Sequence, residues 1–347
     1  MNRELLNGII AALEGQASAN FAATDVNEAA ISAILKEAGL SENPTARELR
    51  NNEAAIFSLI EEAVDEILPK KLENLLGAYA EVRTFARDAE VVFNIEKIGK
   101  NRAKLTISKG ARGGIYRAAR LDSKYFSPET SIQTVAVYVT LEELILGTMS
   151  LAELYANILE GFQEIIYKET FNALAAGVPA AGYNRIYKGA DGAKQEDGNI
   201  VVAKTALSDA VDAVMPYVKQ YGIPTIFGSY AAVNGLYNPL AGGSAGHIND
   251  QDSMDIRNYG FVQMYKGVRV VELPNYLVDN SNDEWFYDPS YVFVIPSGVK
   301  PVKIALKGEL MIRRNTHAVG SEKWEAEKLI GVGLAMANNY AVIKVEE

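Results

Sequence analysis

The stretch from Ser150 to Gly177 constrains the fold of this 347-residue chain most, because it carries the longest uninterrupted helical pattern. Ser150 and Glu153 have the spacing of a capping box, and Gly177 followed by Pro179 marks an end. The pattern predicts a helix of about 26 residues, roughly 39 Å long. Apolar residues at spacings of three and four share one face, which we expect to be buried: Leu151, Leu154, Tyr155, Ile158, Leu159, Phe162, Ile165 and Ile166.

The composition bounds what else the chain can contain. With 48% apolar residues it can bury a substantial core, and its length suggests two or three folding units. The formal charge of −10 argues against nucleic-acid or membrane binding by the surface as a whole. The chain has no cysteine and only two histidines, His247 and His317, which excludes disulfides and histidine-rich metal sites. The acidic, amphipathic start predicts neither a signal peptide nor a membrane span.

Residues 1–87 are predicted to form a helical N-terminal arm. Short amphipathic patterns begin near Leu5, after Asp25 and after Thr45. Pro69 is expected to break or kink the last of them before the apolar stripe resumes. We predict no strand in this region, and such helices cannot close a core alone. The arm is therefore expected to lie against the rest of the protein or a neighbour, with an independent helical domain as the alternative.

Residues 88–131 are predicted to form a basic extended loop. Val91–Ile95 and Ala103–Ser108 have strand-like patterns. From Glu96 to Lys124 there are nine basic and two acidic residues, a net charge of +7. Such a hairpin reaches an acidic surface of another subunit, binds nucleic acid or is simply solvated. Six residues are the candidate inter-subunit contacts: Lys97, Lys100, Arg102, Lys104, Lys109 and Arg112.

The rest of the chain is predicted to mix helices and strands, which gives an α+β fold class. Residues 132–200 combine a strand, Ile132–Val139, with the long helix and a glycine-rich loop after it. Residues 201–300 are predicted to form an α/β unit that begins with a helix from Thr205 and a strand Pro224–Gly228. A helix capped by Ser229 and a hairpin that turns at Lys266-Gly267 are expected to follow. Residues 301–347 supply returning strands: Val302–Leu306, Glu309–Arg313, Lys323–Met336 and Tyr340–Val345.

Motifs that would support catalysis or metal binding are weak. Gly242 to Gly246 matches the nucleophile elbow around Ser244, but no buried strand precedes it and no helix follows. Asp250, Asp252 and Asp255 do not fit a calcium loop. There is no Walker loop or dinucleotide fingerprint. The sequence therefore predicts no enzyme, no cofactor and no metal, and a soluble serine hydrolase using Ser244 is kept only as a distant alternative.

The order of these elements resembles the major capsid proteins of tailed bacteriophages, which have the Hong Kong 97 type of fold. The resemblance covers about Ala55 to the end. It rests on the order of the elements and not on a signature motif. In chain order these elements are a helical arm, the loop Val91–Ser131, the spine helix Leu151–Ala176, the helix Ala206–Tyr221, the strand and helix Ile223–Leu236, the run Gly260–Pro274, the strand Lys323–Leu334 and the final Asn339-Tyr-Ala-Val-Ile.

The resemblance implies a capsid fold with a long spine helix, an extended β-hairpin loop, an axial α/β domain and a peripheral domain of long strands plus helix. It implies a structural subunit that assembles as hexamers and pentamers into an icosahedral head enclosing double-stranded DNA. Scaffolding, portal or decoration proteins are further expected partners, and no membrane is involved. The protein would be made in the host cytoplasm and reside in the virion. An encapsulin-type compartment shell shares the fold and is the main alternative.

Overall fold

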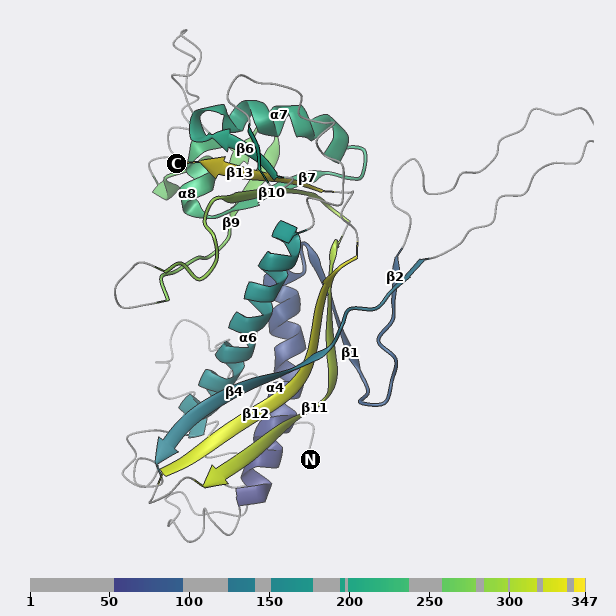
Figure 1. Ribbon diagram of the computed structural model, residues 1–347, viewed down its shortest axis with the longest axis vertical. Helices are drawn as coiled ribbons and strands as arrows, with labels where there is room; N and C mark the ends of the chain where they lie inside the picture. Colours follow the sequence, from purple (N-terminus) through teal and green to yellow (C-terminus); the bar gives the residue numbers. More distant parts are fainter. Residues whose placement is uncertain are drawn as a thin grey trace, which may run out of the picture.

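The computed structural model of the protein describes two stacked parts and a projecting two-stranded ribbon (Figure 1). The ribbon pairs β2 (Phe93–Ile95) with β3 (Lys124–Phe126). The described residues are 53–95, 124–140, 151–176, 194–196, 199–236, 258–278, 284–298, 300–316, 321–335 and 340–346.

The elongated part packs two long helices on one face of a four-stranded sheet (Figure 1). Both helices contact sheet residues that point to the same face: Lys328 contacts the first helix, at Asp65, and Val135 lies beside the second, at Gly161. The helices are α4 (Glu53–Leu76) and α6 (Leu151–Ala176). The strands, in sheet order, are β1 (Ala80–Phe85), β11 (Val302–Thr316), β12 (Ser321–Leu334) and β4 (Ser131–Thr140).

The second part is a seven-stranded mixed sheet with two helices. The helices are α7 (Leu207–Val218) and α8 (Tyr230–Val233), with 3₁₀ turns at Lys204–Ala206 and Asn234–Leu236. The strands, in sheet order, are β5 (Lys194–Glu196), β6 (Asn199–Ala203), β13 (Ala341–Glu346), β10 (Tyr291–Pro296), β7 (Pro224–Gly228), β9 (Val268–Glu272) and β8 (Met264–Tyr265).

The predicted length of the long helix is confirmed, and its buried face is confirmed at four of the eight predicted positions, whereas Ile165 is only partly buried. α6 has 26 residues, and its apolar stripe is buried at Ile158, Leu159, Phe162 and Ile166. These side chains join a core that includes α4 and the four-stranded sheet and extends to Phe293 of the seven-stranded sheet. One continuous core therefore links the two parts.

The prediction for residues 53–87 is wrong in two respects, because Pro69 does not break the helix and a strand is present. α4 continues through Pro69 as one helix of 24 residues, and β1 follows it as a strand parallel to β11. Burial of Ile67, Leu68 and Leu72 around the proline offsets the cost of about 3 kcal/mol that an interior proline imposes. Residues 53–85 are thus part of the core of the elongated part, whereas residues 1–52 lie outside the described residues.

Several predicted strand limits also need correction. β11 is one strand of 15 residues rather than two, because Gly308 at φ 72° lets the chain bulge between Lys307 and Met311 instead of turning. The predicted loop before residue 200 contains β5 and the start of β6. The hairpin turn at Lys266 and Gly267 is confirmed, with φ of 48° and 80°.

Two carboxylates of α4 hold the bulge of β11. Asp65 accepts a hydrogen bond from Leu310 N–H at 2.9 Å and forms an ion pair with Lys328, whose side chain is only 3% exposed. One turn earlier, Glu61 accepts a hydrogen bond from Ile312 N–H at 2.6 Å. The helix thus supplies acceptors for backbone N–H groups that the irregular strand pairing leaves without a partner.

Replacing Asp65 tests this clamp. Asp65→Ala would leave a buried ammonium and a backbone N–H without their partner, so we expect the free energy of unfolding in urea to fall by about 3 kcal/mol. The control Lys70→Ala removes an exposed ion pair to Glu66, 3.1 Å long, and should cost less than about 1 kcal/mol. Equal losses for the two variants would contradict the clamp.

The Glu61 carboxyl predicts a pH dependence. Burial raises its pKa, the Ile312 hydrogen bond opposes the shift, and repulsion from Asp65 and Glu309 adds to it. A carboxyl with a raised pKa in the folded state stabilises the fold when protonated, and that contribution is lost as pH rises through the shifted pKa. Glu61→Gln should therefore match the parent at pH 3 and exceed it at pH 7, by less than about 1 kcal/mol because the group is partly exposed. Urea titrations at both pH values measure this, and a Gln variant weaker than the parent only at pH 7 would refute it.

Candidate assembly surfaces

The base of the basic loop is fixed to the four-stranded sheet on the face opposite α4 and α6. Phe93 of β2 is fully buried against Ala305, whose neighbours Ile304 and Leu306 point to the helices. Phe85 meets the Phe93 ring edge-on at 5.5 Å, and the Arg83 guanidinium lies 5.5 Å from the same ring. The chain therefore leaves toward residue 96 from a rigid point on this face.

The returning chain is seated by two glycines of β12. A Cβ at Gly331 would lie 2.9 Å from the Glu129 carbonyl oxygen, and one at Gly333 would lie 2.8 Å from the Phe126 ring. Any larger residue here would push the returning chain off the sheet. The register Phe93↔Phe126 then closes the base as an antiparallel pair (Figure 1).

The six predicted contact residues, Lys97, Lys100, Arg102, Lys104, Lys109 and Arg112, all lie outside the described residues, as does the predicted strand Ala103–Ser108. What the structure adds is their anchor. The second strand of the ribbon, β3, was not predicted from the sequence, and the only signal for it is the adjacent pair Tyr125 and Phe126, which are residue types that strands favour. β2 is shorter than predicted and begins at Phe93.

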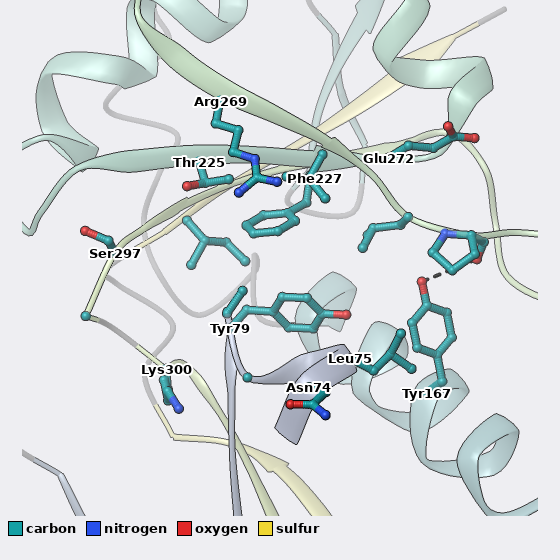
Figure 2. Close-up of a pocket in the computed structure, with 17 residues that line it drawn as sticks. Asn74, Leu75, Tyr79, Tyr167, Thr225, Phe227, Arg269, Glu272, Ser297 and Lys300 are labelled. Atoms are coloured by element: carbon teal, nitrogen blue, oxygen red, sulfur yellow. Dashed lines mark hydrogen bonds between the residues drawn. The ribbon is translucent and has the colours of Figure 1, made fainter. Parts of the chain in front are cut away.

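A hollow of about 540 Å³ lies where the two parts meet (Figure 2). Its walls include Tyr79, Phe227 and Arg269, and the Tyr79 and Phe227 rings meet edge-on at 5.3 Å. Tyr167 O–H donates to the Pro274 carbonyl at 3.3 Å, and burial raises the pKa of Tyr167 to about 12. The lining mixes aromatic and aliphatic side chains with polar ones such as Arg269, Glu272 and Lys300, and burial raises the pKa of the Tyr79 and Tyr167 phenols, so they stay neutral.

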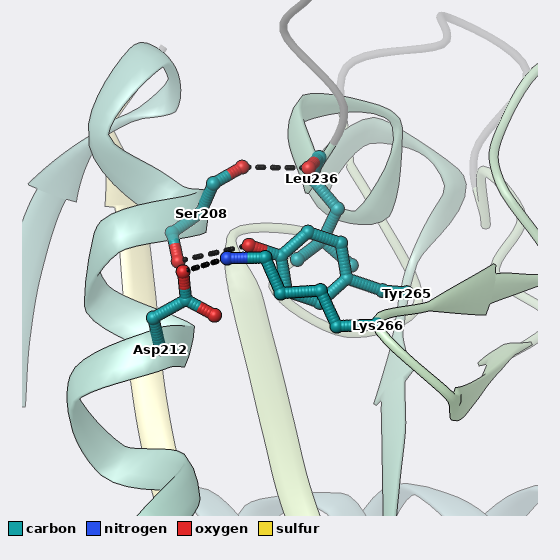
Figure 3. A network of polar contacts seen from close by, with 5 residues as sticks. All are labelled: Ser208, Asp212, Leu236, Tyr265 and Lys266. Carbon is teal, nitrogen blue, oxygen red and sulfur yellow. Dashed lines mark hydrogen bonds and ion pairs between the residues drawn. The ribbon is translucent and has the colours of Figure 1, made fainter. Parts of the chain in front are cut away.

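A second polar network ties the β8–β9 turn to α7 (Figure 3). Lys266 forms an ion pair with Asp212, and that contact raises the lysine pKa. Tyr265 O–H donates to the Ser208 carbonyl at 3.3 Å, while Ser208 Oγ donates to the Leu236 carbonyl at 2.6 Å. Every member is thus satisfied within the protein, and the network fixes the hairpin.

The described residues contain no group of three His, Asp or Glu side chains arranged to hold a metal ion. Ser244 and the aspartates Asp250, Asp252 and Asp255 lie outside those residues. Among the helices that the structure describes, none has the length and apolar character needed to cross a membrane.

The comparisons with known proteins give the family. The sequence matches the family described as "SPbeta prophage-derived putative capsid protein YonB" over residues 3–343. The chain belongs to this capsid protein family. No curated protein matches it.

Similarity to solved structures agrees with this family at the level of fold. A chain of the satellite phage P4 procapsid, in a structure that includes the size determination (Sid) protein, aligns with a TM-score of 0.53 at 11% identity, covering 82% of this chain and 90% of that chain. The virus-like particle from Pyrococcus furiosus aligns at 0.45 and 11% identity, over 82% and 97% of the two chains. The alignment to the P4 procapsid chain, whose TM-score exceeds 0.5, supports a mixed helix-and-sheet fold of the Hong Kong 97 capsid type.

Gly331→Val tests the seat of the loop. A side chain at this position collides with the Glu129 carbonyl, so we expect the ribbon and residues 126–130 to detach while the helix-side core keeps its packing. Proteolysis should then cut near residues 88–130 at least about tenfold faster, since local opening costs less. The control is Gly267→Ala, which meets no neighbouring atom and is strained only by its φ of 80° in the distant β8–β9 turn, so it should leave cleavage near residues 88–130 unchanged. Equal protection of the Val variant and the parent would show that the seat is dispensable.

Proposed function

We propose that the protein is the major capsid protein of a tailed-phage-type head and self-assembles as hexamers and pentamers into an icosahedral shell. The observation that carries the proposal is the family match over residues 3–343, supported by the fold. In this proposal the elongated part is the peripheral domain with α6 as its spine, the seven-stranded part is the axial domain, and residues 88–131 are the extended loop. The protein acts as a structural subunit and not as an enzyme.

The partners follow from that role. A second copy of the chain is the main partner, double-stranded DNA lies against the inner surface, and scaffolding, portal or decoration proteins bind the shell. Residence in the virion after synthesis in the host cytoplasm is part of the proposal. Negative-stain electron microscopy of the full chain tests it directly, because closed particles are expected. A monomer at every protein concentration would refute it, and particles filled with a cargo enzyme instead of DNA would favour the encapsulin alternative.

We propose further that Lys97, Lys100, Arg102, Lys104, Lys109 and Arg112 contact a neighbouring subunit. Their anchor is rigid, and the net charge of +7 lies in a chain with a total of −10. Exposed ion pairs contribute only about 0.2 to 1 kcal/mol each, so the effect comes from their number and from repetition around a shell.

Reversing Lys97, Lys100 and Arg102 together to Glu should leave the thermal melt of the subunit unchanged and abolish particles in electron micrographs. Higher ionic strength should weaken early assembly of the parent, because salt screens exposed charges. Normal assembly of the triple variant would show that these residues are solvated. Loss of DNA binding with intact assembly would place them on the inner surface.

A further inference from the structure

Apolar and acidic side chains gather where α6 meets the segment after β9, and most of them are exposed, although Phe286 is only 8% exposed. Tyr276 and Phe286 stack at 4.8 Å, and Phe286 stacks in turn on Tyr167 of α6 at 6.1 Å. Leu75 is 47% exposed beside them, and Glu160 and Glu164 of α6 are exposed. We name Leu75, Glu160, Glu164, Tyr276 and Phe286 the acid-aromatic patch, which lines a hollow of about 240 Å³.

The backbone holds this patch in place. Phe286 N–H donates to the Tyr276 carbonyl, and Val278 N–H donates to the Glu284 carbonyl, both at 2.9 Å, so the segment doubles back on itself. Asn275 and Tyr287 close the turn with a hydrogen bond of 3.0 Å. Hydrogen bonds between the two halves of this segment therefore fix the positions of the Tyr276 and Phe286 rings.

The electrostatics of the patch favour a cation. Neither Glu160 nor Glu164 has a lysine or arginine partner among the described residues, and Glu164 accepts only the Tyr276 O–H, at 2.5 Å. Burial raises the pKa of Tyr276, and the charges of Glu164 and Glu160 raise it further. Lys168 of α6 places a cation over the Phe286 ring, with its Nζ 5.8 Å from the ring centre. Gln163 Nε2, in the wall of the hollow, is a buried donor with no partner among the described residues.

We propose that the acid-aromatic patch receives an arginine of the basic segment 96–124 from a second copy of this chain. The inference rests on the proposed function, since it names the surface that the basic loop meets. A guanidinium suits the patch better than an ammonium, because it stacks on an aromatic ring while donating to two carboxylates. The segment offers four arginines: Arg102, Arg112, Arg117 and Arg120.

The placement in the fold fits a head-to-tail arrangement. Figure 1 shows the β2–β3 ribbon on one lateral side of the elongated part and the segment after β9, beside α6, on the other. A contact between opposite sides of identical subunits closes into a ring when the rotation permits. Between β2 and β3 the chain has 28 residues, so an out-and-back path reaches at most about 46 Å.

Cysteine cross-linking tests the contact directly, because the natural chain has no cysteine. Leu75→Cys keeps both carboxylates of the patch, and it is mixed with single variants Arg102→Cys, Arg112→Cys, Arg117→Cys or Arg120→Cys before assembly and mild oxidation. We expect a disulfide-linked dimer with at least one of the four. The matched control is Ile223→Cys, which is 73% exposed on the seven-stranded part and should not link.

A charge variant tests the energetic role. Glu160→Gln with Glu164→Gln removes both charges while an amide oxygen can still accept from Tyr276, so we expect an unchanged thermal melt and loss of most assembled particles. Glu62→Gln with Glu66→Gln also removes two carboxylates from a helix, although Glu66 is paired with Lys70, and this variant of α4 should assemble as the parent does. If the parent forms no particles, the proposed function fails first. If the parent assembles, and Leu75→Cys does not link and the patch variant assembles normally, this inference alone is overturned.

Discussion

Packing of two long helices on one face of the four-stranded sheet is the constraint on which the rest of the structure depends. The apolar stripes of α4 and α6 meet the same strands, and the resulting core continues to Phe227 and Phe293 of the other part. Since a sheet of four strands has two faces, covering one with helices leaves the other available. The basic loop is anchored on that second face, at Phe93 and Ala305. The arrangement of the core thus decides where the loop leaves the subunit.

Charge in this protein is distributed so that folding and association use different groups. The lysines of the sheet that are buried, Lys303 and Lys328, are paired inside the subunit with Glu81 and Asp65. These two lysines are buried in ion pairs within the subunit, so a neighbouring molecule cannot contact their charges. The segment 96–124 carries a net charge of +7, and neither glutamate of the acid-aromatic patch has a lysine or arginine partner among the described residues. In the proposed assembly these opposite charges belong to complementary surfaces of two copies.

The seven-stranded part is held together by pairing between strands that lie far apart in the sequence. Its buried strands pair β10 with both β7 and β13, so segments from residues 224–228, 291–296 and 341–346 meet in one layer. The end of the chain is thereby returned to the centre of the sheet. The edge-on contact of Phe171 of α6 with Phe293 of β10, at 5.2 Å, connects this layer to α6. The two parts consequently form a continuous body, with the hollow of Figure 2 at their junction.

The sequence by itself determined the elements whose periodicity is strong and local. The 26 residues of α6, the strand Pro224–Gly228 with its Ser229 cap, and the turn at Lys266-Gly267 follow from spacing, capping and turn chemistry that act over a few residues. Only the tertiary structure decided that α4 runs through Pro69, that Gly308 makes a bulge, and that β3 exists, because burial and pairing with distant strands outweigh local preference there. The acid-aromatic patch belongs to the same class, since Glu160 and Tyr276 are brought together only by packing between segments more than a hundred residues apart.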